Sequence, residues 1–179
     1  MKILALSGSL RAASLNTLLL HATARLAPAD IEVSLYPGLG NLPLFNPDLE
    51  AADPPPVAHL RRHILATDAL LIASPEYAHG VTGVMKNALD WMVGNESFVA
   101  RPVALFNASA RATIAQQSLR EIISTMSARI VDSACITVPL LGSELSEDDI
   151  VAHPVISIAI IHALQNLQTA VAANKTGDQ

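Results

Sequence analysis

The chain has 179 residues, of which 51% are apolar and 15% charged, and its formal net charge is −5. This composition is typical of a globular protein, and the length suits one domain over residues 1–179. Aromatic residues make up only 3% and no run of Lys and Arg occurs, which argues against a nucleic-acid partner. The single cysteine, Cys135, excludes an internal disulfide and favours a reducing, cytoplasmic compartment.

Two apolar segments invite comparison with membrane signals. The N-terminal run stops at residues 7–9 (Ser-Gly-Ser), too early for the apolar region of a signal peptide. No Asp, Glu, Lys or Arg occurs from Ile150 to Asn174, but His, Pro, Gln and Asn side chains interrupt this stretch. Each of these would be costly in hydrocarbon, so we expect no membrane span and no membrane partner.

Five short apolar runs predict strands, and most are continuous rather than alternating. They are Ile3–Leu6, Ile31–Leu35, Ala69–Ala73, Val103–Phe106 and Ile130–Val138. Continuous apolar strands indicate burial on both faces, as in a parallel sheet.

A segment with helical spacing of apolar residues follows each predicted strand. Ser14 is placed to cap the first of these helices, prolines 54–56 precede the second, and Pro154 starts the last. The third and fourth lie around residues 84–92 and 114–126. Residues 146–149 (Ser-Glu-Asp-Asp) form a separate capped turn.

The repeated order of strand and helix predicts an α/β fold with helices on both faces of an open sheet. Five parallel strands fit the flavodoxin-like, doubly wound order 2-1-3-4-5. In such folds ligands bind at the carboxyl ends of the strands. We therefore expect the loops after the first, third and fourth strands to form the functional site.

The loop after the first strand carries groups that suit a terminal phosphate. Ser9, Ser14 and Asn16 can donate hydrogen bonds, and Arg11 adds a positive fork in front of a helix N-terminus. A polar loop whose serine only caps the helix is the alternative interpretation. The sequence contains neither Gly-x-x-x-x-Gly-Lys-Ser/Thr nor Gly-x-Gly-x-x-Gly, so a P-loop is excluded and a Rossmann dinucleotide turn is disfavoured.

The third strand leads into residues 74–83, which suit a flat ligand. Pro75 stiffens the exit from the strand, and Gly80 and Gly83 let backbone come close to a ring. Backbone N–H and C=O groups of this loop are candidates for pairing with the rim of a flavin.

Three segments together resemble a known family. Residues 8–16 read Gly-Ser-Leu-Arg-x-x-Ser-x-Asn, residues 42–48 read Leu-Pro-Leu-Phe-Asn-Pro-Asp, and in residues 75–91 Pro-Glu-Tyr-x-His-Gly leads to Lys-Asn-Ala-Leu-Asp-Trp. In order and spacing these segments are similar to the NADPH-dependent FMN reductase family, which includes quinone, azo-dye and chromate reductases. The resemblance extends over most of the chain.

The resemblance implies FMN as cofactor, NADPH or NADH as co-substrate, and a small acceptor such as a quinone, azo compound, metal oxyanion or free flavin. Hydride transfer through flavin N5 would carry the chemistry, with no catalytic side chain and no metal. It also implies a homodimer or homotetramer. The residues implied to bind the cofactor are Ser9, Arg11, Ser14, Asn16 and Thr17 at the phosphate, Pro75, Glu76, Tyr77, Ala78 and Gly80 at the ring, and Ser109 at the ribityl chain or ring edge.

Some positions depart from the commonest pattern of this family. Ala78 stands where asparagine is frequent, and Thr82 stands where proline is frequent. The fourth-strand loop, residues 107–111, is poorer in glycine than in many relatives. Arg11 and Arg111 are further candidates for the 2′-phosphate of NADPH, so the choice of co-substrate and of acceptor stays open.

The alternative function is a flavodoxin-type electron carrier without direct NAD(P)H oxidation. Such carriers usually have a Thr-rich phosphate loop and aromatic residues beside the ring, and aromatics are scarce here. A signalling receiver would need acidic residues after the first strand and an Asp after the third, where residues 7–9 and 74–75 have none. No Gly-x-Ser-x-Gly elbow of a hydrolase occurs.

Other chemically capable residues have simpler interpretations. His59 and His63 lie one turn apart on the polar side of a predicted helix, and we expect them to be exposed. Cys135 is expected to be a buried apolar residue within the fifth strand, and Trp91 to be a core or subunit contact. The acidic turn at residues 144–149 is expected to be solvated.

Overall fold

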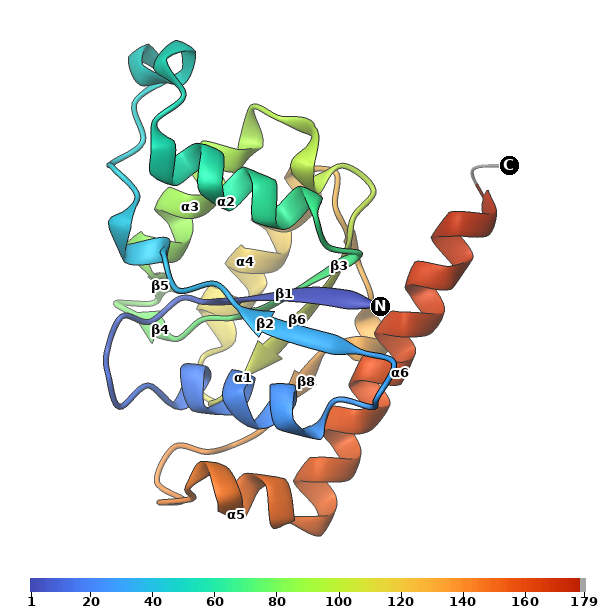
Figure 1. Cartoon of the computed structure of the whole chain (residues 1–179). Helices are drawn as coiled ribbons and strands as arrows, with labels where there is room; N and C mark the ends of the chain where they lie inside the picture. The colour runs from blue at the N-terminus through green and yellow to red at the C-terminus, as the bar shows by residue number, and fades with distance from the viewer. Residues whose placement is uncertain (178–179) are drawn as a thin grey trace.

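The strands of the computed structural model, which describes residues 1–177, follow the predicted order (Figure 1). The sheet is parallel, with order β2-β1-β3-β6-β7 and with β8 paired to β6. The flavodoxin-like expectation is therefore confirmed, while the last two residues of the predicted domain lie outside the described residues. The strands are β1 (Lys2–Ser7), β2 (Glu32–Leu35), β3 (Ala69–Ala73), β6 (Pro102–Asn107), β7 (Arg129–Ile130) and β8 (Ile136–Thr137).

The helices connect these strands in the predicted places. They are α1 (Leu15–Leu26), α2 (Pro55–Leu65), α3 (Gly83–Val93), α4 (Thr113–Thr125), α5 (Glu147–Ala152) and α6 (Pro154–Gly177). Ser14 caps α1 through its hydroxyl, which accepts a hydrogen bond from the Thr17 N–H at 3.2 Å. The predicted capped turn is α5, where Ser146 and Asp149 form a capping box.

The central strands β1, β3 and β6 send alternate side chains into two apolar layers. In β1, Ile3 and Ala5 join the layer beneath α1 and α6, whereas Leu4 and Leu6 join the layer beneath α2, α3 and α4. All four are at most 2% exposed. The continuous apolar runs of the sequence are thus explained by helices on both faces of the sheet.

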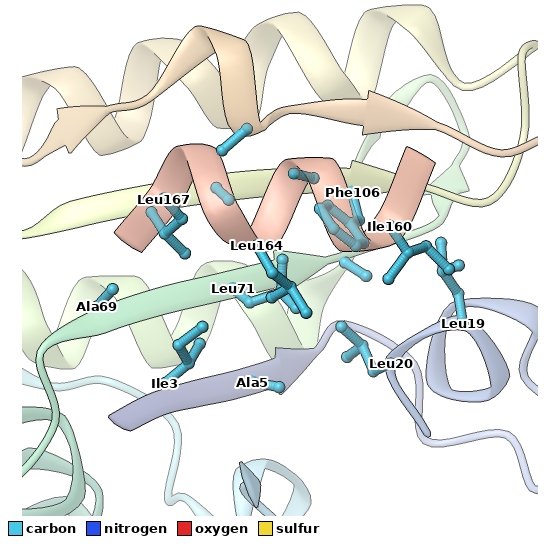
Figure 2. Packing of buried hydrophobic residues seen from close by; sticks show 14 of the residues in the cluster. Ile3, Ala5, Leu19, Leu20, Ala69, Leu71, Phe106, Ile160, Leu164 and Leu167 are labelled. Carbon is cyan, nitrogen blue, oxygen red and sulfur yellow. The ribbon is translucent and has the colours of Figure 1, made fainter. Parts of the chain in front are cut away.

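The C-terminal helix α6 covers one face of the sheet. Figure 2 shows Ile160, Leu164 and Leu167 of α6 over Leu71 of β3 and Phe106 of β6. By length and composition Pro154–Asn174 could cross a bilayer, with a mean hydropathy of 1.4. These three residues are 0–1% exposed and belong to the core, but only 28% of the apolar window is buried, and Val155 and Ile158 are exposed.

The fifth predicted strand, Ile130–Val138, is not continuous. β7 and β8 both pair with β6, with Ile130 opposite Val103 and Ile136 opposite Phe106. The chain therefore advances six residues from β7 to β8 while β6 advances only three. The residues between them cannot all pair with β6, because too few residues of β6 lie opposite them. Three of them form a 3₁₀ turn, η4 (Asp132–Ala134). Cys135 therefore follows this turn instead of lying within a strand, and it is only partly buried.

Three further 3₁₀ turns and one small hairpin complete the chain. The turns are η1 (Leu39–Asn41), η2 (Pro47–Ala52) and η3 (Glu96–Phe98). The hairpin is formed by β4 (Glu76–Tyr77) and β5 (Gly80–Val81), which pair antiparallel in the loop after β3. The sequence patterns gave no sign of this hairpin, whose strands have two residues each.

Candidate functional site

One cavity, with a volume of about 330 Å³, opens at the carboxyl ends of β1, β3 and β6. The loops expected to form the site all contribute to it. Its lining consists of Ser9, Arg11, Ala13, Ser14, Leu15, Asn16, Pro75, Glu76, Tyr77, Asn107, Ala108, Ser109, Arg111, Ala112 and Leu141. A cavity of this size, partly apolar and with a few polar groups, is suited to a small organic ligand.

The loops after β1 and β3 touch each other at Gly8. A Cβ atom on Gly8 would lie 2.2 Å from the Ser74 hydroxyl oxygen, so no larger residue fits there. The Gly8 carbonyl also accepts a hydrogen bond from the Thr82 hydroxyl at 2.7 Å. Thr82, found where relatives often have proline, thereby joins the first loop to the start of α3, which it also caps.

Asn16 presents an unsatisfied polar group beside the cavity. The residue is 6% exposed, and its Oδ1 has no hydrogen-bond partner within the described residues. A buried polar atom without a partner costs free energy, commonly about 1–3 kcal/mol, unless a ligand satisfies it. Asn16 is on the first turn of α1, whose N-terminus favours an anion. This corner of the cavity is therefore suited to a phosphate and its neighbouring hydroxyl groups.

Thr17 has a different environment from the other predicted phosphate residues. Its hydroxyl lies 2.7 Å from the Ser7 hydroxyl, and the residue does not line the cavity. The contact ties the first turn of α1 to the end of β1. Thr17 thus supports the loop, whereas Ser9, Arg11 and Ser14 face the open space.

The hairpin after β3 places Pro75, Glu76 and Tyr77 along the cavity wall. Ala78 and His79 form its two-residue turn, with φ angles of 49° and 56°. Positive φ at both central positions is the requirement of a type I′ turn, where asparagine and glycine are favoured. The predicted residues Ala78 and Gly80 do not line the cavity.

Glu76 connects the hairpin to the N-terminus of α4. Its carboxylate accepts a hydrogen bond from the Ala115 N–H at 2.8 Å and lies 3.1 Å from His79 Nδ1. The Ala115 bond and, to a smaller extent, His79 hold the pKa of Glu76 below its ordinary value. Since α4 has no cap from its own preceding residue, Glu76 supplies that cap from 39 residues earlier in the chain.

The loop after β6, which also lines the cavity, is held in a tight conformation by its own side chains. The Asn107 side chain accepts a hydrogen bond from the Ser109 N–H at 3.0 Å. The Ser109 hydroxyl in turn accepts one from the Arg111 N–H at 3.2 Å. The loop after β1 contains the same kind of contact between a serine and the arginine two residues later. There the Ser9 hydroxyl accepts a hydrogen bond from the Arg11 N–H at 3.4 Å. Both arginines are exposed and line the cavity.

The remaining motif residues fix the loop that follows β2. Asn87 donates to the Pro43 carbonyl at 2.9 Å and accepts from the Phe45 N–H at 2.8 Å. Trp91 donates its indole N–H to the same Pro43 carbonyl at 2.8 Å and is 3% exposed. Trp91 is thus a core residue, and the Asn-x-x-x-Trp spacing serves to bind residues 43–45 to α3.

Most of the predicted cofactor residues meet in one place. Ser9, Arg11, Ser14, Asn16, Pro75, Glu76, Tyr77 and Ser109 all line the cavity. Sequence reasoning missed Ala13, Leu15 and Ala112, which carry no chemical signal, and Leu141, which follows the unpredicted break in the fifth strand. His59 and His63 are exposed as predicted and lie on α2, where the Tyr36 hydroxyl is 3.0 Å from His59 Nδ1.

Comparison with known proteins decides the family. The model of the NADPH-dependent FMN reductase family matches residues 1–140. The chain belongs to this family. Membership confirms the predicted class of enzyme, an NAD(P)H-dependent FMN oxidoreductase, and the residues present fit the cofactor. The buried Asn16 oxygen can accept a hydrogen bond from the ligand, and Arg11 and the N-terminus of α1 favour an anion.

Individual relatives agree with this family assignment. An NAD(P)H-dependent FMN reductase of Pseudomonas aeruginosa is 40% identical over 112 residues, 61% of this chain and 60% of that protein. A 2-hydroxy-1,4-benzoquinone reductase of a Burkholderia species is 38% identical over 68% of this chain and 69% of its own length. A solved structure of the flavoenzyme NAD(P)H:(acceptor) oxidoreductase of Paracoccus denitrificans superposes with a TM-score of 0.80, at 26% identity, covering 96% of this chain and 95% of that one.

Proposed function

We propose that this FMN reductase family member oxidises NAD(P)H and reduces a small quinone, with FMN held in the cavity at the carboxyl ends of β1, β3 and β6. The observation that carries the proposal is the buried Asn16 oxygen, which has no hydrogen-bond partner among residues 1–177, together with Arg11 and the first turn of α1 in the lining of the same cavity. A resident ligand with a phosphate and hydroxyl groups would satisfy all three.

The phosphate end of the ligand would be held by the first loop. Ser9 and Ser14 offer hydroxyl groups, Arg11 offers a guanidinium fork, and the first turn of α1 offers backbone N–H groups. The Asn16 oxygen would accept a hydrogen bond from a ribityl hydroxyl. Gly8 and Thr82 keep this loop against β3, so its donors are already oriented before the ligand binds.

The ring end would lie between the hairpin wall and the loop after β6. Pro75, Glu76 and Tyr77 offer their backbone to one edge, and Ser109 lines the cavity from the loop after β6. FMN, when bound, supplies the two-electron chemistry, so no acid or base of the chain has to drive it. Because Glu76 is occupied by Ala115 and His79, its role is to fix the hairpin against α4.

A quinone is the acceptor that we propose. The relatives include the Burkholderia benzoquinone reductase and a quinone reductase of Escherichia coli, which is 30% identical over 74% of this chain and 74% of that protein. The structure of this chain also supports a quinone. Tyr77 and Leu141 line the cavity and are 56% and 58% exposed. These side chains offer apolar surface to a flat, uncharged ring. Co-substrate and acceptor would share this one opening, which predicts ping-pong kinetics.

We also propose a cytoplasmic homodimer or homotetramer. A groove of about 220 Å³ between α3 and α4 supports a self-association surface, and its lining combines the apolar residues Leu89, Val93, Ile122 and Met126 with the polar residues Lys86, Asp90, Glu121 and Thr125. Light scattering coupled to size-exclusion chromatography measures the mass of the particle. A monomer at micromolar concentration would contradict this part of the proposal.

The function is tested by anaerobic spectroscopy of the purified protein loaded with FMN. We expect NADPH or NADH to bleach the flavin absorbance and a benzoquinone to restore it. Initial rates at several concentrations of both substrates should then give parallel double-reciprocal lines. Intersecting lines would contradict the shared opening.

Two other results would change the assignment. Bound flavin that neither nucleotide bleaches, but that forms a persistent one-electron species on photoreduction, would favour the flavodoxin-type electron carrier. A protein that binds no FMN under any condition would show that the cavity has another ligand.

A further inference from the structure

Two arginines line the cavity, although one cofactor phosphate accounts for only one of them. Arg11 and Arg111 are both exposed, and neither has a carboxylate within ion-pair distance among residues 1–177. Glu76 is the acidic residue of the lining, and its oxygens already face the Ala115 N–H and His79. With two guanidinium groups and one carboxylate, the lining is formally positive in a chain whose net charge is −5.

The two arginines stand at helix ends that differ in one decisive way. The N-terminus of α1, behind Arg11, is capped by the uncharged Ser14 hydroxyl and presents Leu15 and Asn16 to the cavity. The N-terminus of α4, behind Arg111, is already capped by the Glu76 carboxylate. An anion near Arg111 must therefore be bound by the guanidinium without help from the helix. Such an exposed, single-residue contact suits a group that enters and leaves, rather than the phosphate of a resident cofactor.

We propose that Arg111 binds the 2′-phosphate of NADPH and so makes the enzyme prefer NADPH to NADH. A guanidinium pairs with a phosphate dianion through two parallel N–H···O bonds, a geometry that the hydroxyl of NADH cannot offer. The inference rests on the proposed function, because the co-substrate must lie over a cavity that holds FMN. It goes further by assigning a separate anion subsite to the loop after β6.

A binding measurement tests this subsite without relying on turnover. Adenosine 2′,5′-bisphosphate and 5′-AMP are titrated calorimetrically into the FMN-loaded wild type, Arg111→Ala and Arg62→Ala. Arg62 is the matched control, since it is an exposed arginine on α2 that does not line the cavity. We expect the wild type and Arg62→Ala to bind the bisphosphate about tenfold more tightly than 5′-AMP, and Arg111→Ala to lose this difference.

Steady-state kinetics provide a second test of the Arg111 subsite. In Arg111→Ala the KM for NADPH should rise by about tenfold, while the KM for NADH and the kcat with either nucleotide stay unchanged. The affinity for FMN, measured by reconstitution of the apoprotein, should also be unchanged. Arg111→Lys should recover part of the preference, because a lysine keeps the charge but not the fork.

Several results would overturn the inference. Loss of FMN affinity in Arg111→Ala would place this arginine at the cofactor phosphate. A raised KM for a sulfonated naphthoquinone, with the KM for NADPH unchanged, would place it at an anionic acceptor. Equal binding of the bisphosphate and 5′-AMP by the wild type would show that no 2′-phosphate subsite exists. Should FMN fail to bind at all, the proposed function falls, and the same titrations on the apoprotein still decide the role of Arg111.

Discussion

The Glu76 carboxylate and the Ala115 N–H, 2.8 Å apart, join the hairpin after β3 to the first turn of α4 beside the cavity. Glu76 belongs to the hairpin after β3, and Ala115 belongs to the first turn of α4. The contact gives α4 the cap that its own sequence lacks, and it fixes the hairpin against this helix. A residue in the family motif Pro-Glu-Tyr thus has a structural role in shaping the site.

Replacing Glu76 by alanine should loosen the hairpin and the start of α4 at once. We expect the temperature of unfolding to fall by roughly a few degrees, because the first turn of α4 loses its acceptor. FMN affinity should fall as well, since the hairpin is no longer fixed. Glu76→Gln keeps an acceptor oxygen and should be affected less. Glu121→Ala, an exposed change on the same helix, is the control, and an equal loss there would contradict the assignment.

The Glu76 contact should also make stability depend on pH. The pKa of Glu76 is lowered in the folded state by the Ala115 N–H bond, so its contribution to stability is fully present above the ordinary pKa of 4.5. It is lost as the pH falls below that value, through the lowered folded-state pKa. Urea unfolding of the wild type and of Glu76→Gln, followed from pH 7 to pH 3, should show a smaller acid loss in the variant. Identical slopes would show that the carboxylate charge is unimportant.

Replacing Asn16 should lower the affinity for FMN without lowering the stability of the apoprotein. Asn16→Ala removes a buried oxygen that has no partner within the described residues, so the apoprotein should be no less stable than the wild type. The affinity for FMN should nevertheless fall by about tenfold, as expected for one lost hydrogen bond to a buried group. Fluorescence titration of FMN and denaturant unfolding of the apoprotein measure the two effects. Unchanged affinity would move the cofactor away from this corner.

The hairpin turn is strained at Ala78, and asparagine should relieve it. The φ angle of Ala78 is 49°, in the left-handed region, where a residue with a Cβ loses roughly 1–2 kcal/mol and asparagine loses less. Ala78→Asn should therefore raise the free energy of unfolding by roughly 0.5–1 kcal/mol. Ala78→Val, which is β-branched, should lower it. The reverse order of the two variants in urea unfolding would exclude a type I′ turn.

Asn87 should be important for the loop that follows β2. Asn87→Ala leaves the Phe45 N–H without its acceptor, at a cost of about 1–3 kcal/mol in unfolding free energy. Asn87→Asp keeps the acceptor for the Phe45 N–H but places a carboxylate oxygen beside the Pro43 carbonyl oxygen, so it should also be destabilising. Limited proteolysis within residues 39–53 should increase in the alanine variant.

The layered architecture could be predicted because its causes are local. Continuous apolar runs such as Ala69–Ala73, with helical spacing between them, leave few solutions other than a parallel sheet between two helix layers. The grouping of four residues of the first loop at the cavity could be predicted for a similar reason. Ser9, Arg11, Ser14 and Asn16 are close in sequence and precede a helix, so their common position follows from the turn after β1.

Tertiary structure alone decided the features that depend on partners far away in the chain. The break in the fifth strand follows from the length of β6 available for pairing, which no property of residues 130–138 reveals. Glu76 was expected at the ring, but its carboxylate is engaged by a backbone N–H 39 residues away. Leu141 and Arg111 come to one cavity only because the sheet brings separate loops to the same edge. Local sequence determines which elements form, whereas pairing lengths and contacts between loops determine which side chains remain free to bind a ligand.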